Sequence, residues 1–373
     1  MEVGMSDGIL YHGDCLDVLR AFPDACVDLI YLDPPFNSNR DFFGRDGQVA
    51  FRDRWRWDEQ ARREAASLEK TLSGTHGEAL MPALRSLLGE SGMTAYLVMM
   101  ANRLAELRRV LKSTGSLYLH CDPTASHYLK AVLDAIFGGR NFRNEIIWKR
   151  SVSKNLARRN FAASHDVLFR YAKTKGARFT AQHIPHDPEY ARKRFGYRDA
   201  DGRRYRLDDL TNPARNRPNL TYEFLGVTRT WRWTRERMMK AWEDGRIVLS
   251  SPGAVPRYKV WLEDCPGKAV GDVWDDISPL RGHAEYLGYP TQKPVALLER
   301  VILASSNPGD MVLDPFCGTG TTLHAAQKLG RRWSGIDKET LALSVAFRRM
   351  RAAFPECVFA RGESVDCERK RTY

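Results

Sequence analysis

The chain has 373 residues, of which 43% are hydrophobic and 28% charged, and its formal net charge at pH 7 is +12. This length can accommodate one large α/β domain and a smaller one, with a composition ordinary for a globular protein. No apolar run approaches a membrane span, and the first residues lack the basic start and apolar stretch of a signal peptide. Seven cysteines without a C-x-x-C motif argue against a zinc knuckle or a disulfide framework. We therefore expect reduced thiols, a cytoplasmic location and no metal.

The positive charge is concentrated in one part of the chain. Residues 141–240 contain 24 Lys and Arg and 10 Asp and Glu, a net charge of +14, so the other residues sum to −2. Aromatic residues are interleaved with the basic ones, among them Phe161, Phe169, Tyr171, Tyr190, Phe195, Tyr197, Tyr205, Trp231 and Trp233. Because the excess is confined to about a quarter of the chain, it indicates a polyanion-binding surface rather than a solvated face.

The first 180 residues alternate between strand and helix patterns. We predict strands at 9–12, 27–32, 115–122, 145–150 and 165–173, and helices at 15–22, 93–112 and 124–137. Residues 38–92 interrupt this alternation and are predicted to be an insertion with short helices, whose function the sequence does not indicate.

From about 181 to 280 the alternation disappears, and Arg, Pro, Gly and Trp dominate. It resumes with helices at 294–306, 321–329 and 340–351 and strands at 311–313 and 333–336, before a charged tail after 363. The pattern predicts an α/β fold with one doubly wound, mostly parallel sheet. We expect its two halves, 1–180 and 281–373, to flank an inserted module at 181–280.

A glycine loop follows the predicted strand at 311–313. The strand ends at Asp314, a tight turn holds Gly318 and Gly320, and the next strand ends at Asp337. In an open parallel sheet, such glycines let the backbone approach a nucleoside, and the second acid can hold a ribose diol. The third glycine of a dinucleotide motif is replaced by Leu323, and no Walker A motif occurs, so S-adenosylmethionine (SAM) fits better than NAD or ATP.

The predicted strand at 27–32 ends on an acid, two prolines and a ring: Asp33, Pro34, Pro35 and Phe36. An exocyclic amine of a nucleic-acid base attacks poorly because its lone pair is delocalised into the ring. Hydrogen bonds from that amine to Asp33 and to the Pro34 carbonyl would draw the nitrogen towards tetrahedral geometry, without a covalent intermediate. Phe36 offers a face on which an extruded base could stack. The alternative is a rigid turn followed by a core phenylalanine.

Three motifs occur in one order: "DPPF" at 33–36, "YPTQKPVALLERVI" at 289–302 and "DPFCGTG" at 314–320. Together they resemble the SAM-dependent DNA amino methyltransferases in their β arrangement, over roughly residues 8–180 and 281–351. The resemblance implies a Rossmann-like methyltransferase sheet with a target-recognition module at 181–280. It also implies transfer of a methyl group from SAM to a flipped base in double-stranded DNA, by an enzyme associated with the nucleoid.

The family's functional residues carry over to matching positions. The resemblance implies that the target base is held by Asp33, Pro34, Pro35 and Phe36. It implies that SAM is bound by Asp14, Lys293, Asp314, Phe316, Gly318, Gly320, Thr321 and Asp337. For two of these an alternative stays open: Asp14 could instead cap the helix after it, and Lys293 could be a solvated lysine.

Within this class, adenine N6 is the favoured target, and cytosine N4 is the alternative, because cytosine enzymes of this type often carry serine where Asp33 stands. Phe36 replaces the more frequent tyrosine but keeps a stacking face. A protein glutamine methyltransferase is disfavoured by Asp33 and the motif order, and a non-catalytic DNA-binding protein by the intact loops. A homodimer is compatible with the sequence. Any restriction activity would belong to a separate enzyme, since nuclease and ATPase motifs are absent.

Overall fold

The structure, a computed structural model, describes residues 8–44, 47–151, 159–214, 216–280 and 284–363. The chain divides into two compact units. We call His183–Val270 the inserted unit, and the segments Met1–Gln182 and Gly271–Tyr373 together the main unit. Residues 271–280, which the sequence pattern groups with the module, belong to the main unit, because Val273 and Trp274 pair with its sheet.

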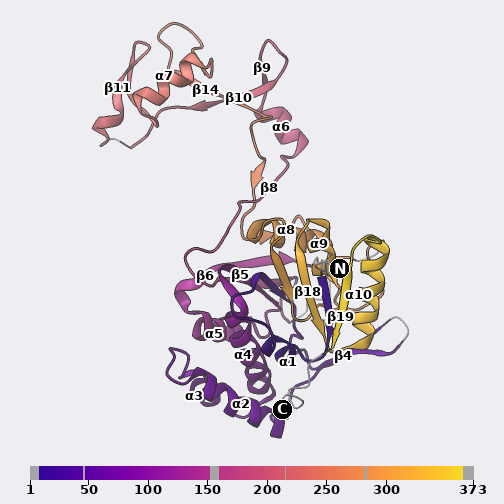
Figure 1. Cartoon of the computed structure of the whole chain (residues 1–373). Coiled ribbons are helices and arrows are strands. Elements are labelled where there is room, and N and C mark those ends of the chain that lie inside the picture. The colour runs from indigo at the N-terminus through magenta and orange to yellow at the C-terminus, as the bar shows by residue number, and fades with distance from the viewer. Residues whose placement is uncertain (1–7, 45–46, 152–158, 215, 281–283, 364–373) are drawn as a thin grey trace, which may run out of the picture. The chain divides into compact units, whose positions relative to one another are not determined.

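A large sheet forms the centre of the main unit (Figure 1). It has nine strands in the order β16-β6-β7-β5-β2-β17-β18-β1-β19. Its strands are β1 (Gly8–His12), β2 (Val27–Leu32), β5 (Leu111–Cys121), β6 (Phe142–Lys149), β7 (His165–Ala172), β16 (Val273–Trp274), β17 (Met311–Asp314), β18 (Arg332–Asp337) and β19 (Phe359–Glu363). Neighbouring strands are parallel except where β7 pairs with β5 and β6. The predicted α/β fold with a mostly parallel sheet is confirmed.

Two groups of helices pack against this sheet (Figure 1). The first contains α1 (Cys15–Arg20), α4 (Gly92–Val110) and α5 (Ser126–Phe137), and the second contains α8 (Val295–Ser305), α9 (Thr321–Lys328) and α10 (Thr340–Ala353). The helix predicted to reach residue 112 ends at Val110, because the chain turns directly into β5 at Leu111. Strand β19 was not predicted from the sequence; it extends the sheet by pairing with β1.

The central strand β2 shows why its sequence is almost continuously apolar. All six of its residues are buried, as expected for a strand covered on both faces. Its one charged residue, Asp28, accepts hydrogen bonds from Lys112 Nζ at 2.7 Å and from the backbone N–H of Met311 at 3.0 Å. The buried carboxylate is thereby paired, and it connects β2 to the neighbouring strands β5 and β17.

The strand order brings the sequence motifs at 33–36 and 314–320 together. Strands β2 and β17 are parallel neighbours, with Ile30 beside Leu313, so Asp33 and Asp314 emerge at the same edge of the sheet. Strands β1 and β18 are also parallel neighbours, with His12 beside Asp337. Ligands of open α/β sheets bind outside the carboxyl ends of the strands, and all these acids lie there.

The insertion at 38–92 contains a hairpin and two helices: β3 (Arg40–Phe43), β4 (Val49–Asp53), α2 (Glu59–Leu72) and α3 (Leu80–Leu88). Phe42 and Phe51 stack across the hairpin with their ring centroids 4.6 Å apart. Helix α2 is longer than the short helices predicted, because its apolar face is buried against α4, through Ala61, Ala65, Leu68 and Leu72.

The inserted unit is built around its own small core. Its elements are β8 (His183–Ile184), α6 (Pro188–Arg194), β9 (Tyr197–Arg198), β10 (Arg204–Asp209), β11 (Thr221–Phe224), β12 (Val227–Thr230), α7 (Arg235–Glu243), β13 (Ile247–Val248), β14 (Arg257–Trp261) and β15 (Lys268–Ala269). The core contains Leu210, Phe224, Trp231, Met238, Ala241 and Ile247. Strands β8 and β15 pair where the chain enters and leaves the unit. Within the described ranges of the whole chain, no helix is long and apolar enough to cross a membrane.

Candidate active site

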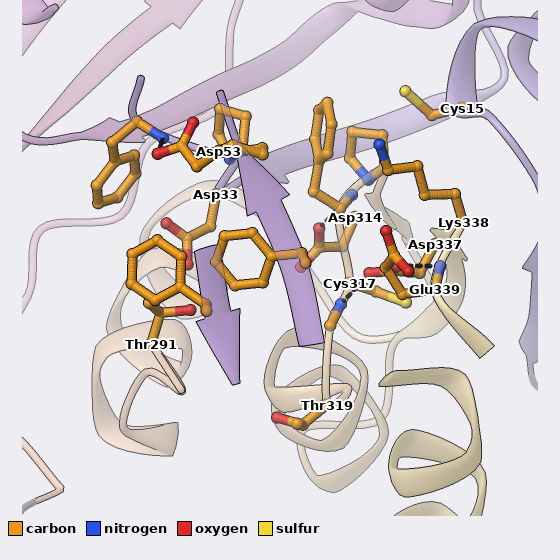
Figure 2. Close-up of a pocket in the computed structure, with 18 of the residues that line it drawn as sticks. Cys15, Asp33, Asp53, Thr291, Asp314, Cys317, Thr319, Asp337, Lys338 and Glu339 are labelled. Carbon is orange, nitrogen blue, oxygen red and sulfur yellow. Dashed lines mark hydrogen bonds between the residues drawn. The ribbon is translucent and has the colours of Figure 1, made fainter. Parts of the chain in front are cut away.

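A pocket opens at the carboxyl ends of β1, β2, β17 and β18 (Figure 2). It brings together eleven of the twelve site residues predicted from the sequence: Asp14, Asp33, Pro34, Pro35, Phe36, Lys293, Asp314, Phe316, Gly318, Thr321 and Asp337. The twelfth, Gly320, does not line the pocket. Figure 2 shows Asp33, Asp314 and Asp337 placed along the same cavity.

The two carboxylate oxygens of Asp33 have different surroundings. Oδ2 accepts a hydrogen bond from Lys293 Nζ at 2.5 Å. Oδ1 is buried, and no described residue provides it with a hydrogen-bond partner. A buried acceptor is costly to leave unpaired, so this oxygen is poised for a donor that enters the pocket.

Lys293 is held against Asp33 by a strained loop. Its ammonium also donates to the Thr291 carbonyl at 3.2 Å and lies 5.3 Å from the centre of the Phe36 ring. Thr291 has a φ of +63°, which is rare for a β-branched residue and is typical of functional sites. Lys293 is therefore a buried partner of Asp33, not a solvated lysine; a contact with a cofactor remains a prediction.

The Phe36 ring packs against a buried network of hydrogen-bonded side chains. It stacks on His120, with centroids 5.9 Å apart and planes inclined by 21°. His120 is fully buried and forms hydrogen bonds with the Tyr31 hydroxyl at 2.8 Å and with Asp166 Oδ2 at 3.2 Å. Sequence reasoning missed this pair, although a histidine and an aspartate inside otherwise apolar strands were the available signal.

The glycine loop packs directly on Asp337. The N–H of Gly318 donates to Asp337 Oδ2 at 2.8 Å, and the N–H of Glu339 donates to Oδ1 at 2.9 Å. Gly318 has a φ of +51°, and a Cβ built on it would meet no atom within 4 Å, so the loop leaves an open cradle there. A different feature explains the glycine at position 320. Its φ is +74°, and a Cβ there would lie 3.1 Å from the Ala346 Cβ, so Gly320 allows α9 and α10 to pack closely.

Burial shifts two acids of the pocket towards the neutral form. It raises the pKa of Asp337 to about 6 and that of Asp314 to about 7. Asp314 holds the turn, since Oδ1 accepts from the Phe316 N–H at 3.0 Å and Oδ2 from the Thr322 hydroxyl at 2.5 Å. Thr321, the first residue of α9, accepts from Arg349. Acids still outnumber bases in the pocket lining, seven to three, which favours a ligand that carries positive charge.

Asp14 caps α1 and also forms an ion pair. Its Oδ1 accepts from the N–H of Leu16 at 2.8 Å, which is the capping alternative raised by the sequence. Both oxygens accept from Arg103 Nη2, at 2.8 and 2.6 Å, and Arg103 is almost fully buried. Arg103 also lines the pocket and was missed, because nothing in the pattern of α4 singles out one of its basic residues.

The pocket thus combines two parts. One part, made by the glycine loop, Asp14 and Asp337, has the form of a nucleoside site; the other, made by Asp33, Phe36 and Lys293, has an open acceptor beside an aromatic face. Among the residues that the structure describes, no group of three or more His, Cys, Asp and Glu is arranged to hold a metal ion. Fold and site together define an α/β protein whose pocket lies outside the carboxyl ends of its strands, at the switch point of the sheet.

Comparison with known protein families identifies the family of this chain. A model of the N6/N4 DNA methylase family matches residues 27–348, and the chain belongs to this family. The resemblance stated from the sequence motifs is confirmed.

Individual relatives are also similar over most of this chain. It is 31% identical to the type II methyltransferase M.EcaI of Enterobacter cloacae, over 86% of this chain and 64% of the relative. It is 24% identical to the DNA adenine methyltransferase YhdJ of Escherichia coli K12, over 92% of this chain and 83% of the relative. A solved structure of the PvuII cytosine-N4-specific DNA methyltransferase matches at 14% identity with a TM-score of 0.45, over 95% of each chain. The chain spans between 51% and 64% of the length of the first three curated relatives.

Proposed function

We propose that the protein is a DNA methyltransferase that moves a methyl group from SAM to the exocyclic amine of a flipped base. The favoured target is adenine N6, and cytosine N4 is the alternative. The observation that carries the proposal is Asp33, whose Oδ1 is a buried acceptor without a described partner, beside a stacking ring and a glycine loop. An amine needs such an acceptor, because a hydrogen bond from its N–H makes its lone pair available for attack.

We call residues 33–39 the catalytic loop. In this proposal Pro34, Pro35 and Phe36 of this loop, and Lys293 outside it, have separate roles. Phe36 stacks on the extruded base, and its ring is fixed by His120. Lys293 keeps Oδ2 of Asp33 occupied, so that Oδ1 accepts from the amine. Pro34 and Pro35 hold the turn and add no N–H donors that would compete with the base for acceptors. Catalysis would then come from position and electrostatics, since no nucleophilic side chain is required.

The acidic part of the pocket fits SAM. Its sulfonium and ammonium groups are positive, and Asp14, Asp337 and Glu339 line the space beside the glycine loop. Asp337 would hold the ribose, Gly318 and Phe316 would lie against the nucleoside and methionine parts, and the bound SAM would supply an electrophilic methyl group. The open cradle above Gly318 supports this placement, because a side chain there would occupy the space of the ligand.

We assign target recognition to the inserted unit and phosphate contacts to the basic segment 141–240, part of which lies outside the described residues. Residues 141–182 of the main unit carry 10 Lys and Arg against 2 Asp and Glu, and the inserted unit carries 18 against 12. The partner would be double-stranded DNA in the cytoplasm, at the nucleoid. Any cognate restriction enzyme would be a separate chain. Whether the protein forms a homodimer can be read from its molecular mass in solution.

The test is single-turnover methylation with tritiated SAM on DNA that contains the recognition sequence, found by sequencing modified bases in cells that express the protein. Asp33→Ala should lower the transfer rate on the order of 100- to 1,000-fold, with the affinity for SAM nearly unchanged. Product analysis distinguishes N6-methyladenine from N4-methylcytosine. A near-parental rate in Asp33→Ala would rule out this loop as the catalytic centre.

A further inference from the structure

The backbone that follows Pro35 is bound by a carboxylate from the insertion. Asp53, the last residue of β4, is 1% exposed. Its Oδ2 accepts from the N–H groups of Phe36 at 3.2 Å and Ser38 at 2.7 Å, and its Oδ1 accepts from the N–H of Asn37 at 2.9 Å. The indole N–H of Trp55 completes the set with a hydrogen bond to Oδ1 at 3.0 Å. One buried side chain therefore fixes three consecutive peptide groups of the loop.

Only an ionised carboxylate suits these four donors. Each oxygen accepts two hydrogen bonds, so every donor is satisfied and the buried charge is compensated by N–H dipoles. An asparagine at position 53 would keep one acceptor oxygen but would turn an NH₂ group towards two of the donors. The site consequently distinguishes aspartate from its isosteric amide, which gives a mild and specific test.

The loop has a backbone conformation that an anchor can stabilise. Asn37 and Asn39 have φ values of +60° and +56°, in the left-handed region that few residues with a Cβ other than asparagine and aspartate adopt. The hairpin that supplies Asp53 is itself held by Tyr289, a residue of the pocket lining, whose hydroxyl donates to the Ala50 carbonyl at 3.3 Å. Ala50, Tyr289 and Ala342 pack together there. The hairpin thus joins the catalytic loop to the loop that carries Lys293.

We propose that Asp53 is a positioning residue: through Phe36, Asn37 and Ser38 it sets the orientation of the catalytic ring and of the turn before it. Holding the catalytic loop is then the role of the hairpin at 40–53, to which the sequence assigned none. The anchoring of the loop stands on the geometry alone, while its effect on methyl transfer rests on the proposed function.

The first experiment follows amide hydrogen exchange by mass spectrometry in the full chain without ligands. Asp53→Asn should speed exchange of the amides of Phe36, Asn37 and Ser38 by about 10- to 100-fold, since each loses a charged acceptor. Asp41→Asn is the matched control: Asp41 lies on β3 of the same hairpin and accepts from Arg54 Nε at 3.0 Å, whereas the amides of 36–38 donate to Asp53. Parental exchange at 36–38 in Asp53→Asn would overturn the proposal.

The second experiment measures single-turnover methyl transfer and SAM binding in the same variants. Asp53→Asn should lower the transfer rate at saturating SAM and DNA by about 10- to 100-fold and leave the dissociation constant for SAM within about twofold. A merely structural role would instead weaken SAM binding and lower the melting temperature together. If the parent protein methylates no DNA, the proposed function fails, and the exchange experiment still decides the role of Asp53.

A second variant covers the case in which Asp53→Asn does not fold. Trp55→Phe keeps an aromatic ring and removes the indole donor, so Asp53 gains freedom to rotate about its three backbone contacts. Exchange at 36–38 should rise by a few-fold in this variant. With Asp53→Asn unfolded, an unchanged exchange pattern in Trp55→Phe would also overturn the proposal.

Discussion

At the scale of single residues, Phe36 illustrates how a buried support can make an aromatic ring useful. The ring lines the pocket on one side and stacks on His120 on the other. Burial raises the pKa of Tyr31 well above its ordinary value, so the hydroxyl that meets His120 stays neutral. Because Tyr31 and Asp166 hold the imidazole, the Phe36 ring rests on a fixed surface rather than on a mobile side chain.

Phe36→Ala should weaken productive capture of the base by about 10- to 100-fold, by the usual size of base–aromatic stacking. Phe36→Tyr and Phe36→Trp keep a ring and should retain most of the activity. The measurement is the single-turnover rate as a function of DNA concentration, with SAM affinity as the control for an intact cofactor site. Equal rates in Phe36→Ala and the parent would mean that the ring is only a core residue.

Asp337 gives the site a pH dependence whose sign follows from its raised pKa. With a pKa of about 6, its carboxyl group is ionised at pH 8 and mostly protonated at pH 5. The protonated form loses negative charge beside a cationic ligand, so SAM affinity should fall by about tenfold as pH drops from 8 to 5. Calorimetry should show this fall in the parent and a smaller one in Asp337→Asn. Constant affinity over this range would exclude Asp337 from the site.

At the scale of elements, the glycine loop between β17 and α9 matters through its backbone. Gly318→Leu should weaken SAM binding by about 100-fold or more. The leucine side chain would enter the cradle, and the residue would be strained at positive φ. Gly309→Leu is a matched control, since Gly309 has a φ of +83°, also faces open space, and lies outside the pocket. It should cost a similar amount of stability and leave SAM affinity unchanged. Equal losses in both variants would attribute the effect to strain alone.

At the scale of the whole molecule, the charge distribution predicts how the protein meets DNA. If the segment 141–240 neutralises phosphates, affinity for duplex DNA should fall steeply with salt. Reversing two exposed charges of this segment, Lys149→Glu with Arg159→Glu, should reduce the slope of log affinity against log salt by about 2. Arg63→Glu with Lys70→Glu on α2, the same charge change outside the segment, should leave it nearly unchanged. An equal effect of both pairs would show that net charge, and not this surface, controls binding.

The sequence by itself determined most strands of the central sheet and the motif residues that meet in the pocket. Alternation of apolar strands and helices is a local pattern, so the main strands beside the motifs could be assigned without coordinates. The motifs are equally local: an acid at a strand end followed by prolines or glycines has a definite backbone chemistry wherever it occurs. Eleven of the twelve residues predicted from these motifs and from the family resemblance meet in one cavity.

Only the tertiary structure decided how those residues contact one another. Lys293 reaches Asp33, and Asp53 reaches the backbone after Pro35, across sequence gaps that no periodicity records. Gly320 was predicted to bind the cofactor; the structure shows that it lies outside the pocket lining and that a Cβ there would come within 3.1 Å of the Ala346 Cβ. Such pairings depend on strand order and on side chains meeting from distant elements, because hydrogen bonds and packing act through space and not along the chain.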